Sequence, residues 1–144
     1  MEKVHFIGIG GTGLSAIARV LLERGYCVSG SDQSSSPVLG ELKDAGAEIH
    51  VGHYAENLKD VDLVIRSSAI PADNPEIRAA KTAGIPVLKR SEVLSWLLVD
   101  EKVIAVAGTH GKTTTTAMMA WTLNQLGLDP SFIIGSESKD LHCN

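Results

Sequence analysis

The chain alternates between short runs of apolar residues and longer segments in which apolar residues recur at helical spacing. Residues 4–9 form the first run, which is typical of a strand buried on both faces of a parallel sheet. After a glycine-rich turn, Leu14, Ile17 and Leu21 recur on one helix face, and Gly25 is placed to end that helix. The same pattern predicts further strands at 26–30, 48–51, 63–66 and 86–88, and further helices at 38–45, 76–83 and 92–98, the last with Ser91 as its N-cap.

A second strand–turn–helix unit follows a short linker at 99–102. An apolar strand is predicted from residue 103, a helix over 113–125 and another strand at 132–134. Strands and helices that alternate with short connections predict an α/β fold with a mostly parallel sheet. We expect residues 1–98 to form a Rossmann-like, doubly wound domain. Residues 99–144 are expected to be the truncated start of a P-loop ATPase domain, because they are too few for a complete one.

Composition and charge are those of an ordinary globular protein. Of the 144 residues, 44% are hydrophobic and 21% are charged, and the formal net charge of −4 gives no reason to expect a nucleic-acid partner. No apolar run approaches the roughly 18 residues of a membrane span, and residues 1–7 predict a strand rather than a signal peptide. Cys27 and Cys143 make a poor disulfide framework, and Cys27 is expected to be buried in its strand. These features favour a cytoplasmic protein without a membrane partner.

Three glycines follow the first strand with the spacing of a nucleotide-binding loop. Gly8, Gly10 and Gly13 fit G-x-G-x-x-G between a strand and a helix. Asp32 ends the second strand at the distance where an acidic residue contacts a ribose hydroxyl. The arrangement predicts a site for a nucleotide diphosphate and, taken alone, is the pattern of an NAD-binding domain. In the alternative interpretation, the glycines serve only a tight turn and close packing of the helix.

A second phosphate-binding pattern lies where the strand from residue 103 meets its helix. Gly108 and Gly111 bound a turn that is followed by Lys112 and Thr113. Backbone N–H groups and the helix dipole face an anion at such a helix N-terminus. Lys112 would add charge beside the distal phosphates, and the Thr113 hydroxyl would bind Mg²⁺. The strict P-loop pattern needs a glycine where the chain has Val106, so the loop is a shortened variant.

Taken together, these motifs resemble the Mur ligase family over residues 3–134. The segments that carry the resemblance are 5–15, 29–32, 67–71, 74–76 and 107–114. Within the family, His110 is similar to the branches that add L-alanine or recycle a murein tripeptide, and the first glycine loop is more similar to the alanine-adding branch. Leu14 replaces a common methionine, which is a volume-conserving change, and residues 135–138 depart from the expected glycine and apolar residues.

The resemblance implies an ATP-dependent ligase that joins L-alanine to UDP-N-acetylmuramate through an acyl phosphate in peptidoglycan precursor synthesis. It implies ATP and Mg²⁺ as cofactors, Lys112 and Thr113 as catalytic residues, and Thr113 as a metal ligand. The implied ATP site comprises Gly108, Thr109, His110, Gly111, Lys112, Thr113 and Thr114. The implied UDP-sugar site comprises Gly10, Gly11, Thr12, Gly13, Leu14, Ser31, Asp32, His53, Ser67, Ser68, Ala69 and Arg90.

Some of these residues also have an ordinary structural interpretation. Ser67, Ser68 and Ala69 either close over a pyrophosphate or form a serine-rich turn. His53 either contacts the base or is a solvated loop histidine, and Arg90 either binds the ligand or is only solvated. Two other functional classes stay open, an NAD-dependent oxidoreductase or NAD-sensing domain and a non-catalytic nucleotide sensor. The chain by itself is expected to bind the UDP-sugar without catalysis, and its oligomeric state is not predicted.

Overall fold

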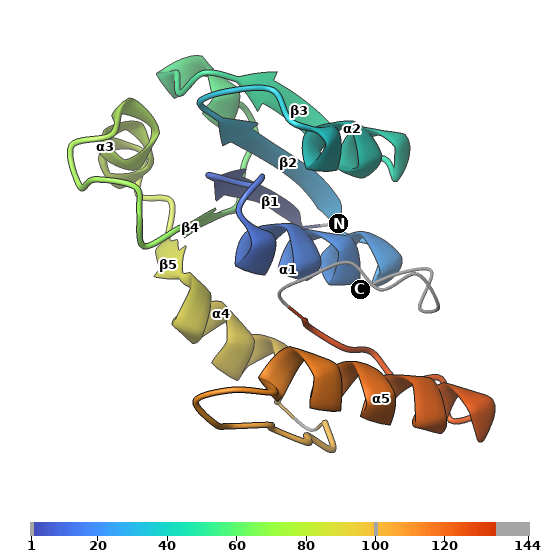
Figure 1. Ribbon diagram of the computed structural model, residues 1–144. Coiled ribbons are helices and arrows are strands. Elements are labelled where there is room, and N and C mark those ends of the chain that lie inside the picture. The colour runs from blue at the N-terminus through green and yellow to red at the C-terminus, as the bar shows by residue number, and fades with distance from the viewer. Residues whose placement is uncertain (1, 100, 135–144) are drawn as a thin grey trace.

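The computed structural model describes residues 2–99 and 101–134, in which five parallel strands form a sheet (Figure 1). The strands are β1 (Lys3–Ile7), β2 (Cys27–Asp32), β3 (Glu48–Val51), β4 (Leu63–Arg66) and β5 (Val87–Lys89). Their order is β3-β2-β1-β4-β5, and every neighbouring pair is parallel. This is the strand order of a Rossmann-like sheet. The predicted α/β fold and its five strands are therefore confirmed.

Helices cover both faces of the sheet (Figure 1). On one face, α1 (Thr12–Glu23), α2 (Pro37–Asp44) and α4 (Arg90–Leu97) contribute to one hydrophobic core. On the other face lie α3 (Pro75–Thr82) and the short 3₁₀ helix η1 (Ala55–Leu58). Because successive side chains of a strand point to opposite faces, β1 serves both layers: Val4 and Phe6 enter the first core, and Ile7 enters the second.

Two details differ from the sequence prediction. Cys27 is exposed rather than buried, because it is the first residue of β2 and pairs with the exposed Lys3 at the rim of the sheet. Helix α4 begins at Arg90, so Ser91 is not its N-cap. Instead the Glu92 carboxylate accepts a hydrogen bond of 2.6 Å from the backbone N–H of Lys89, which is one half of a capping box.

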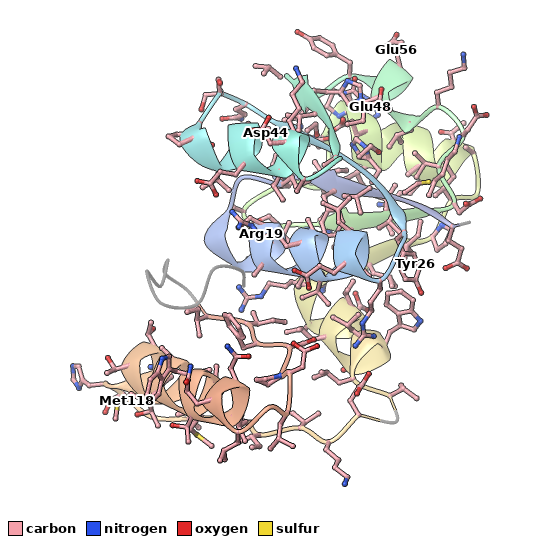
Figure 2. The ribbon with its side chains drawn as sticks, turned by 90° about the vertical axis from the view of Figure 1, so that its right-hand side faces the viewer. Arg19, Tyr26, Asp44, Glu48, Glu56 and Met118 are labelled. Carbon is pink, nitrogen blue, oxygen red and sulfur yellow. The ribbon has the colours of Figure 1, made fainter. Side chains whose placement is uncertain are left out.

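The second unit contains its predicted helix, α5 (Lys112–Gln125), but not its predicted strands. Residues 101–107 and 128–134 are irregular, since no other described strand lies beside them to complete a hydrogen-bonded ladder. Apolar side chains along this unit are accordingly exposed, among them Ile104 and Trp121. Met118 on α5 is a third, and it is labelled in Figure 2. Residues 135–138, where the family pattern is broken, and Cys143 lie outside the described residues.

Polar and aromatic contacts connect α4 and the linker to the sheet domain. The Arg24 guanidinium, just after α1, donates to the Leu97 carbonyl oxygen at 3.3 Å and to the Glu101 carboxylate at 2.9 Å. The rings of Tyr26 and Trp96 pack edge to face at 5.9 Å.

Among the described residues, no helix combines the length and apolar character needed to cross a membrane.

The close packing of Gly30 in the middle of β2 gives a testable prediction. An added Cβ would lie 2.5 Å from Ile9 Cδ1 and 3.0 Å from the Phe6 carbonyl oxygen. We expect Gly30→Ala to lower the free energy of unfolding by about 1–3 kcal/mol, because the buried strand has no room to shift. Gly40→Ala, in α2 with open space around it, is the matched control and should raise stability by about 0.5–1 kcal/mol. Urea unfolding of both variants tests this, and equal stabilities would contradict it.

Candidate functional site

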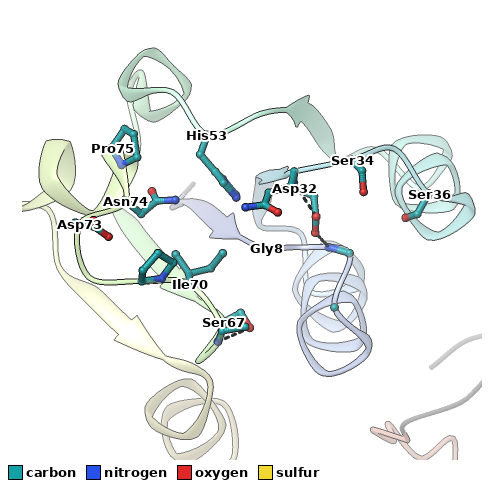
Figure 3. A pocket seen from close by; sticks show the side chains of 15 residues that line it. Gly8, Asp32, Ser34, Ser36, His53, Ser67, Ile70, Asp73, Asn74 and Pro75 are labelled. Carbon is teal, nitrogen blue, oxygen red and sulfur yellow. Dashed lines mark hydrogen bonds between the residues drawn. The ribbon is translucent and has the colours of Figure 1, made fainter.

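A cleft of about 690 Å³ opens at the carboxyl ends of the strands (Figure 3). The strand order reverses between β1 and β4, and parallel α/β sheets bind ligands at such a reversal. The lining residues come from the loops after β1 to β4 and from the start of α3. They are Gly8, Gly10, Gly11, Asp32, Gln33, Ser34, Ser36, His53, Ser67, Ala69, Ile70, Pro71, Asp73, Asn74 and Pro75.

The glycine loop after β1 is held against the end of β2. The backbone N–H groups of Gly8 and Ile9 donate to the Ser31 carbonyl oxygen at 2.8 and 3.1 Å. Gly8 has a φ of +82°, which favours glycine. The Gly10 N–H donates to Asp32 Oδ2 at 2.9 Å, and a Cβ on Gly10 would lie equally close to that oxygen. The loop and the Asp32 carboxylate thus form one unit at the cleft floor.

The N-terminus of α1 combines uncapped backbone donors with a cation. No side chain caps the helix, so the N–H groups of Thr12 and Gly13 have no side-chain acceptor. The Arg90 guanidinium lies directly over Gly13, where any side chain would overlap it. Among the described residues Arg90 has neither a hydrogen bond nor an ion pair. A cation at a helix N-terminus is unfavourable by itself, and an anion between them satisfies both.

A buried carboxylate lies beneath the other side of the cleft. Glu76 sits in the first turn of α3, where Asn74 is the N-cap and its Oδ1 accepts from the Glu76 N–H at 2.9 Å. Pro75 is the first residue of this helix, a position that proline favours. From this capped turn the Glu76 side chain reaches β1 and the end of β2, and none of it is exposed.

Four donors surround the Glu76 carboxylate. Oε1 accepts from Asn57 Nδ2 at 2.7 Å and from His5 Nε2 at 3.2 Å. Oε2 accepts from Ser31 Oγ at 2.7 Å and from His53 Nδ1 at 2.9 Å. Burial raises the pKa of Glu76, but the hydrogen bonds from His5, Ser31 and Asn57 and the charge of His5 together lower it below its ordinary 4.5. Glu76 is therefore a carboxylate at neutral pH.

The structure brings only some residues of the implied UDP-sugar site together. Gly10, Gly11, Asp32, His53, Ser67 and Ala69 line the cleft, and Gly13 and Arg90 meet beside it at the start of α1. The Leu14 side chain is buried in the core, and its N–H already donates to the Gly11 carbonyl oxygen. Ser31 is buried in the Glu76 network, and Ser68 is exposed outside the cleft. The Thr12 side chain is outside the described residues.

The segment after β4 forms a serine-stabilised turn and lines the cleft at the same time. Ser67 Oγ accepts from the Ala69 N–H at 3.3 Å, and the Ser67 carbonyl oxygen accepts from the Ile70 N–H at 3.2 Å. Ser67 and Ala69 still face the cleft. The two interpretations of this segment are thus compatible with each other.

In the glycine-bounded loop before α5, backbone carbonyl oxygens hold the exposed amine of Lys112. Gly111 is the N-cap of α5 with a φ of +78°, and no side chain caps the helix. Lys112 Nζ donates to the carbonyl oxygens of Gly108 and Thr109 at 2.5 and 3.3 Å. The Thr113 side chain beside it is exposed, and the described residues contain no group of three acidic, histidine or cysteine side chains that could hold a metal. The uncapped start of α5 and the adjacent Lys112 amine are the kinds of donor that bind phosphate oxygens.

Sequence reasoning missed the residues behind the cleft, namely Glu76, Asn57 and His5. His5 offered a signal, since it lies in a strand predicted to be buried on both faces, and a buried imidazole needs hydrogen-bond partners. Nothing local in the sequence pairs it with Glu76, which is 71 residues away.

Comparison with known proteins assigns the family. The model described as "Mur ligase family, catalytic domain" matches residues 3–102. The chain belongs to the Mur ligase family. The UDP-N-acetylmuramate–L-alanine ligase of Paenarthrobacter aurescens is 54% identical over the whole chain, and that of Pelobacter propionicus is 51% identical. The chain spans about a third of the length of these two relatives, 32% and 31%.

Solved structures agree with this family assignment. The UDP-N-acetylmuramate-alanine ligase of Thermotoga maritima superposes with a TM-score of 0.93 at 39% identity, covering 99% of this chain and 34% of that one. The UDP-N-acetylmuramate:L-alanyl-γ-D-glutamyl-meso-diaminopimelate ligase of Neisseria meningitidis gives a TM-score of 0.91 at 33% identity, covering 99% and 45%.

The lowered pKa of Glu76 predicts acid sensitivity of this Mur ligase chain. Below pH 4.5 the unfolded chain binds a proton at Glu76 that the folded chain resists, so the free energy of unfolding falls as the pH decreases. In Glu76→Gln this contribution is absent, and stability should fall less steeply below pH 4.5. Glu56→Gln, an exposed change on η1, is the control and should keep the steep fall. Urea unfolding at a series of pH values measures this, and parallel profiles for all three proteins would contradict it.

Proposed function

We propose that the chain is part of an ATP-dependent ligase that joins L-alanine to UDP-N-acetylmuramate in cytoplasmic peptidoglycan precursor synthesis. Residues 1–98 are proposed as the UDP-sugar-binding domain and residues 99–144 as the start of the ATP-binding domain. The observation that carries the proposal is the match of ligases of that name along the entire chain at about half identity. The cleft at the strand ends supports it with donors for a diphosphate.

In the first domain, the chain's own groups can bind and orient a nucleotide diphosphate. The uncapped N-terminus of α1 and the unpaired Arg90 guanidinium offer donors and positive charge for the phosphates. The Asp32 carboxylate, fixed by the N–H groups of Gly10 and Gln33, is an acceptor for ribose hydroxyls. Ser67 and Ala69 form the opposite wall.

In the second unit, Lys112 and the uncapped N-terminus of α5 offer the charge and donors for the ATP phosphates. ATP would supply a phosphoryl group that activates the lactyl carboxylate for attack by the amine of L-alanine. Thr113 would give one oxygen ligand to Mg²⁺, which keeps several waters and phosphate oxygens in such sites. Binding requires the Lys112 amine to exchange the carbonyl oxygens of Gly108 and Thr109 for phosphate oxygens.

The alternatives are less well supported. An NAD-dependent oxidoreductase accounts for the first glycine loop but not for residues 108–114, whereas the ligase accounts for both. A murein-tripeptide recycling ligase is the other ligase alternative. Among the solved structures, the L-alanyl-γ-D-glutamyl-meso-diaminopimelate ligase of Neisseria is 33% identical and the alanine ligase of Thermotoga 39%, while the curated alanine ligases reach 54%. The identity therefore favours L-alanine as the added amino acid.

The unpaired Arg90 tests the UDP-sugar site. We expect the chain to bind UDP-N-acetylmuramate, and we expect Arg90→Ala to weaken this binding by about 10- to 100-fold, because a charged hydrogen bond to the diphosphate is lost. Arg78→Ala, on the exposed surface of α3, is the matched control and should bind as the unaltered chain does. Isothermal titration calorimetry measures the affinities. Tight binding of NAD with no binding of the UDP-sugar would instead indicate the oxidoreductase class.

Lys112 tests the ATP site in the complete ligase. We expect Lys112→Ala to lower kcat by about 100-fold or more, because a preorganised charge next to the transferred phosphoryl group is removed. Steady-state phosphate release with saturating substrates measures this. His110→Ala is the comparison within the same loop. It should lower kcat less than Lys112→Ala does, because it leaves the Lys112 charge in place. An unchanged kcat for Lys112→Ala would contradict the assignment.

A further inference from the structure

His53 has one polar atom without a partner among the described residues, its Nε2. The side chain is only 10% exposed, and it reaches into the cleft between Asp32 and Asn74 (Figure 3). Buried polar atoms in folded proteins nearly always have a hydrogen-bond partner. An orphaned nitrogen at the wall of a ligand cleft therefore points to a partner that comes with the ligand.

The hydrogen-bond network determines which nitrogen of His53 carries the proton. The Glu76 carboxylate can only accept. The Ser31 hydroxyl donates its single proton to Glu76 Oε2 at 2.7 Å, and its oxygen, 2.9 Å from His53 Nδ1, can then only accept from that nitrogen. Nδ1 of His53 also lies 2.9 Å from Glu76 Oε2, so Nδ1 must be the donor. In the neutral imidazole the other nitrogen, Nε2, is then a hydrogen-bond acceptor.

His5 provides an internal contrast, because it contacts the same carboxylate with the opposite nitrogen. Its Nε2 donates to Glu76 Oε1 at 3.2 Å, and its Nδ1 is hydrogen-bonded to the Ser29 hydroxyl at 2.9 Å. Both nitrogens of His5 are satisfied within the protein. Of the two histidines on Glu76, only His53 keeps a nitrogen for something else.

We propose that Glu76 is a positioning residue that fixes the His53 ring, so that Nε2 accepts a hydrogen bond from an N–H or O–H donor on the nucleoside of the bound nucleotide. The proposal rests on the proposed UDP-sugar site, which already includes His53, and adds to it the residue that fixes the His53 ring and the nitrogen that receives the ligand's hydrogen bond. The Asp32 carboxylate already accepts from the loop beside the diphosphate donors, and His53 extends the cleft beyond it at the end of β3. Two donors of a uridine nucleotide have the required chemistry, the imide N3–H of the base and the ribose hydroxyls.

The first experiment measures the tautomer without any ligand. In the ¹⁵N-labelled chain, two-bond ¹⁵N–¹H correlations should show the His53 ring protonated at Nδ1 and the His5 ring protonated at Nε2. In Glu76→Gln the amide cannot accept at both oxygen positions, so His53 should lose its single tautomer. A His53 ring protonated at Nε2 in the unaltered chain would overturn the positioning role.

The second experiment measures the affinity for uridine diphosphate and two analogues, N3-methyl-uridine diphosphate and 2′-deoxyuridine diphosphate. His53→Asn keeps a donor near the Nδ1 position and removes Nε2, so UDP affinity should fall about tenfold. The analogue that lacks the bonded donor should bind the unaltered chain about tenfold more weakly than UDP does. That analogue should bind His53→Asn about as well as it binds the unaltered chain. Which analogue does so identifies the base or the ribose as the source of the donor. His50→Asn, a β3 histidine outside the cleft lining, is the matched control and should bind like the unaltered chain.

Glu76→Gln separates positioning from general loss of structure. If Glu76 acts through His53, Glu76→Gln should weaken UDP binding in the unaltered background but not in the His53→Asn background. Equal UDP affinity of His53→Asn and the unaltered chain would overturn this proposal while leaving the diphosphate site intact. If the unaltered chain did not bind UDP at all, both the proposed nucleotide site and the proposed contact between His53 and the nucleoside would be overturned.

Discussion

The hydrogen bonds to the Glu76 carboxylate join the elements on which the cleft is built. Its four donors come from β1, the end of β2, the loop after β3 and η1. A charge buried in this way is costly unless every acceptor site is used, and removal of one partner leaves the others unsatisfied. The network therefore behaves as a unit. It fixes the start of α3, which forms one wall of the cleft, relative to the β2 end that carries Asp32.

The floor of the cleft and the adjoining start of α1 are determined by close approach rather than by a buried charge. Gly10 lets the loop backbone contact the Asp32 carboxylate, and Gly13 makes room for the Arg90 guanidinium. At each glycine, the missing side chain leaves space for a charged side chain that comes from a distant part of the sequence. The negative group lies on the β2 side of the loop, and the positive group lies at the helix N-terminus, where phosphates bind. A nucleotide can therefore lie with its phosphates near Arg90 and its ribose near Asp32.

Much of this architecture could be predicted from sequence because it depends on local signals. Strand and helix periodicity, the glycine spacing and the position of Asp32 are all readable within short windows, and these gave the sheet and the cleft floor. The Glu76 network could not be predicted in the same way, since His5 and Glu76 meet only after the chain has crossed the sheet several times. The two strands of the second unit were predicted from apolar runs, but a strand also needs neighbours, and residues 103–107 have none among the described residues.

The two proposed phosphate sites differ in how far they are organised before a ligand arrives. In the first, the loop, Asp32 and His53 are all held by contacts with buried or fixed groups, so binding requires little rearrangement. In the second, the loop 108–111 is exposed, and the Lys112 amine next to it is engaged with the carbonyl oxygens of Gly108 and Thr109. A polyphosphate must replace those bonds before Lys112 can contribute its charge. The physical difference is one of burial: the first loop packs on a complete sheet, whereas the second begins a helix whose apolar side chains are still largely uncovered.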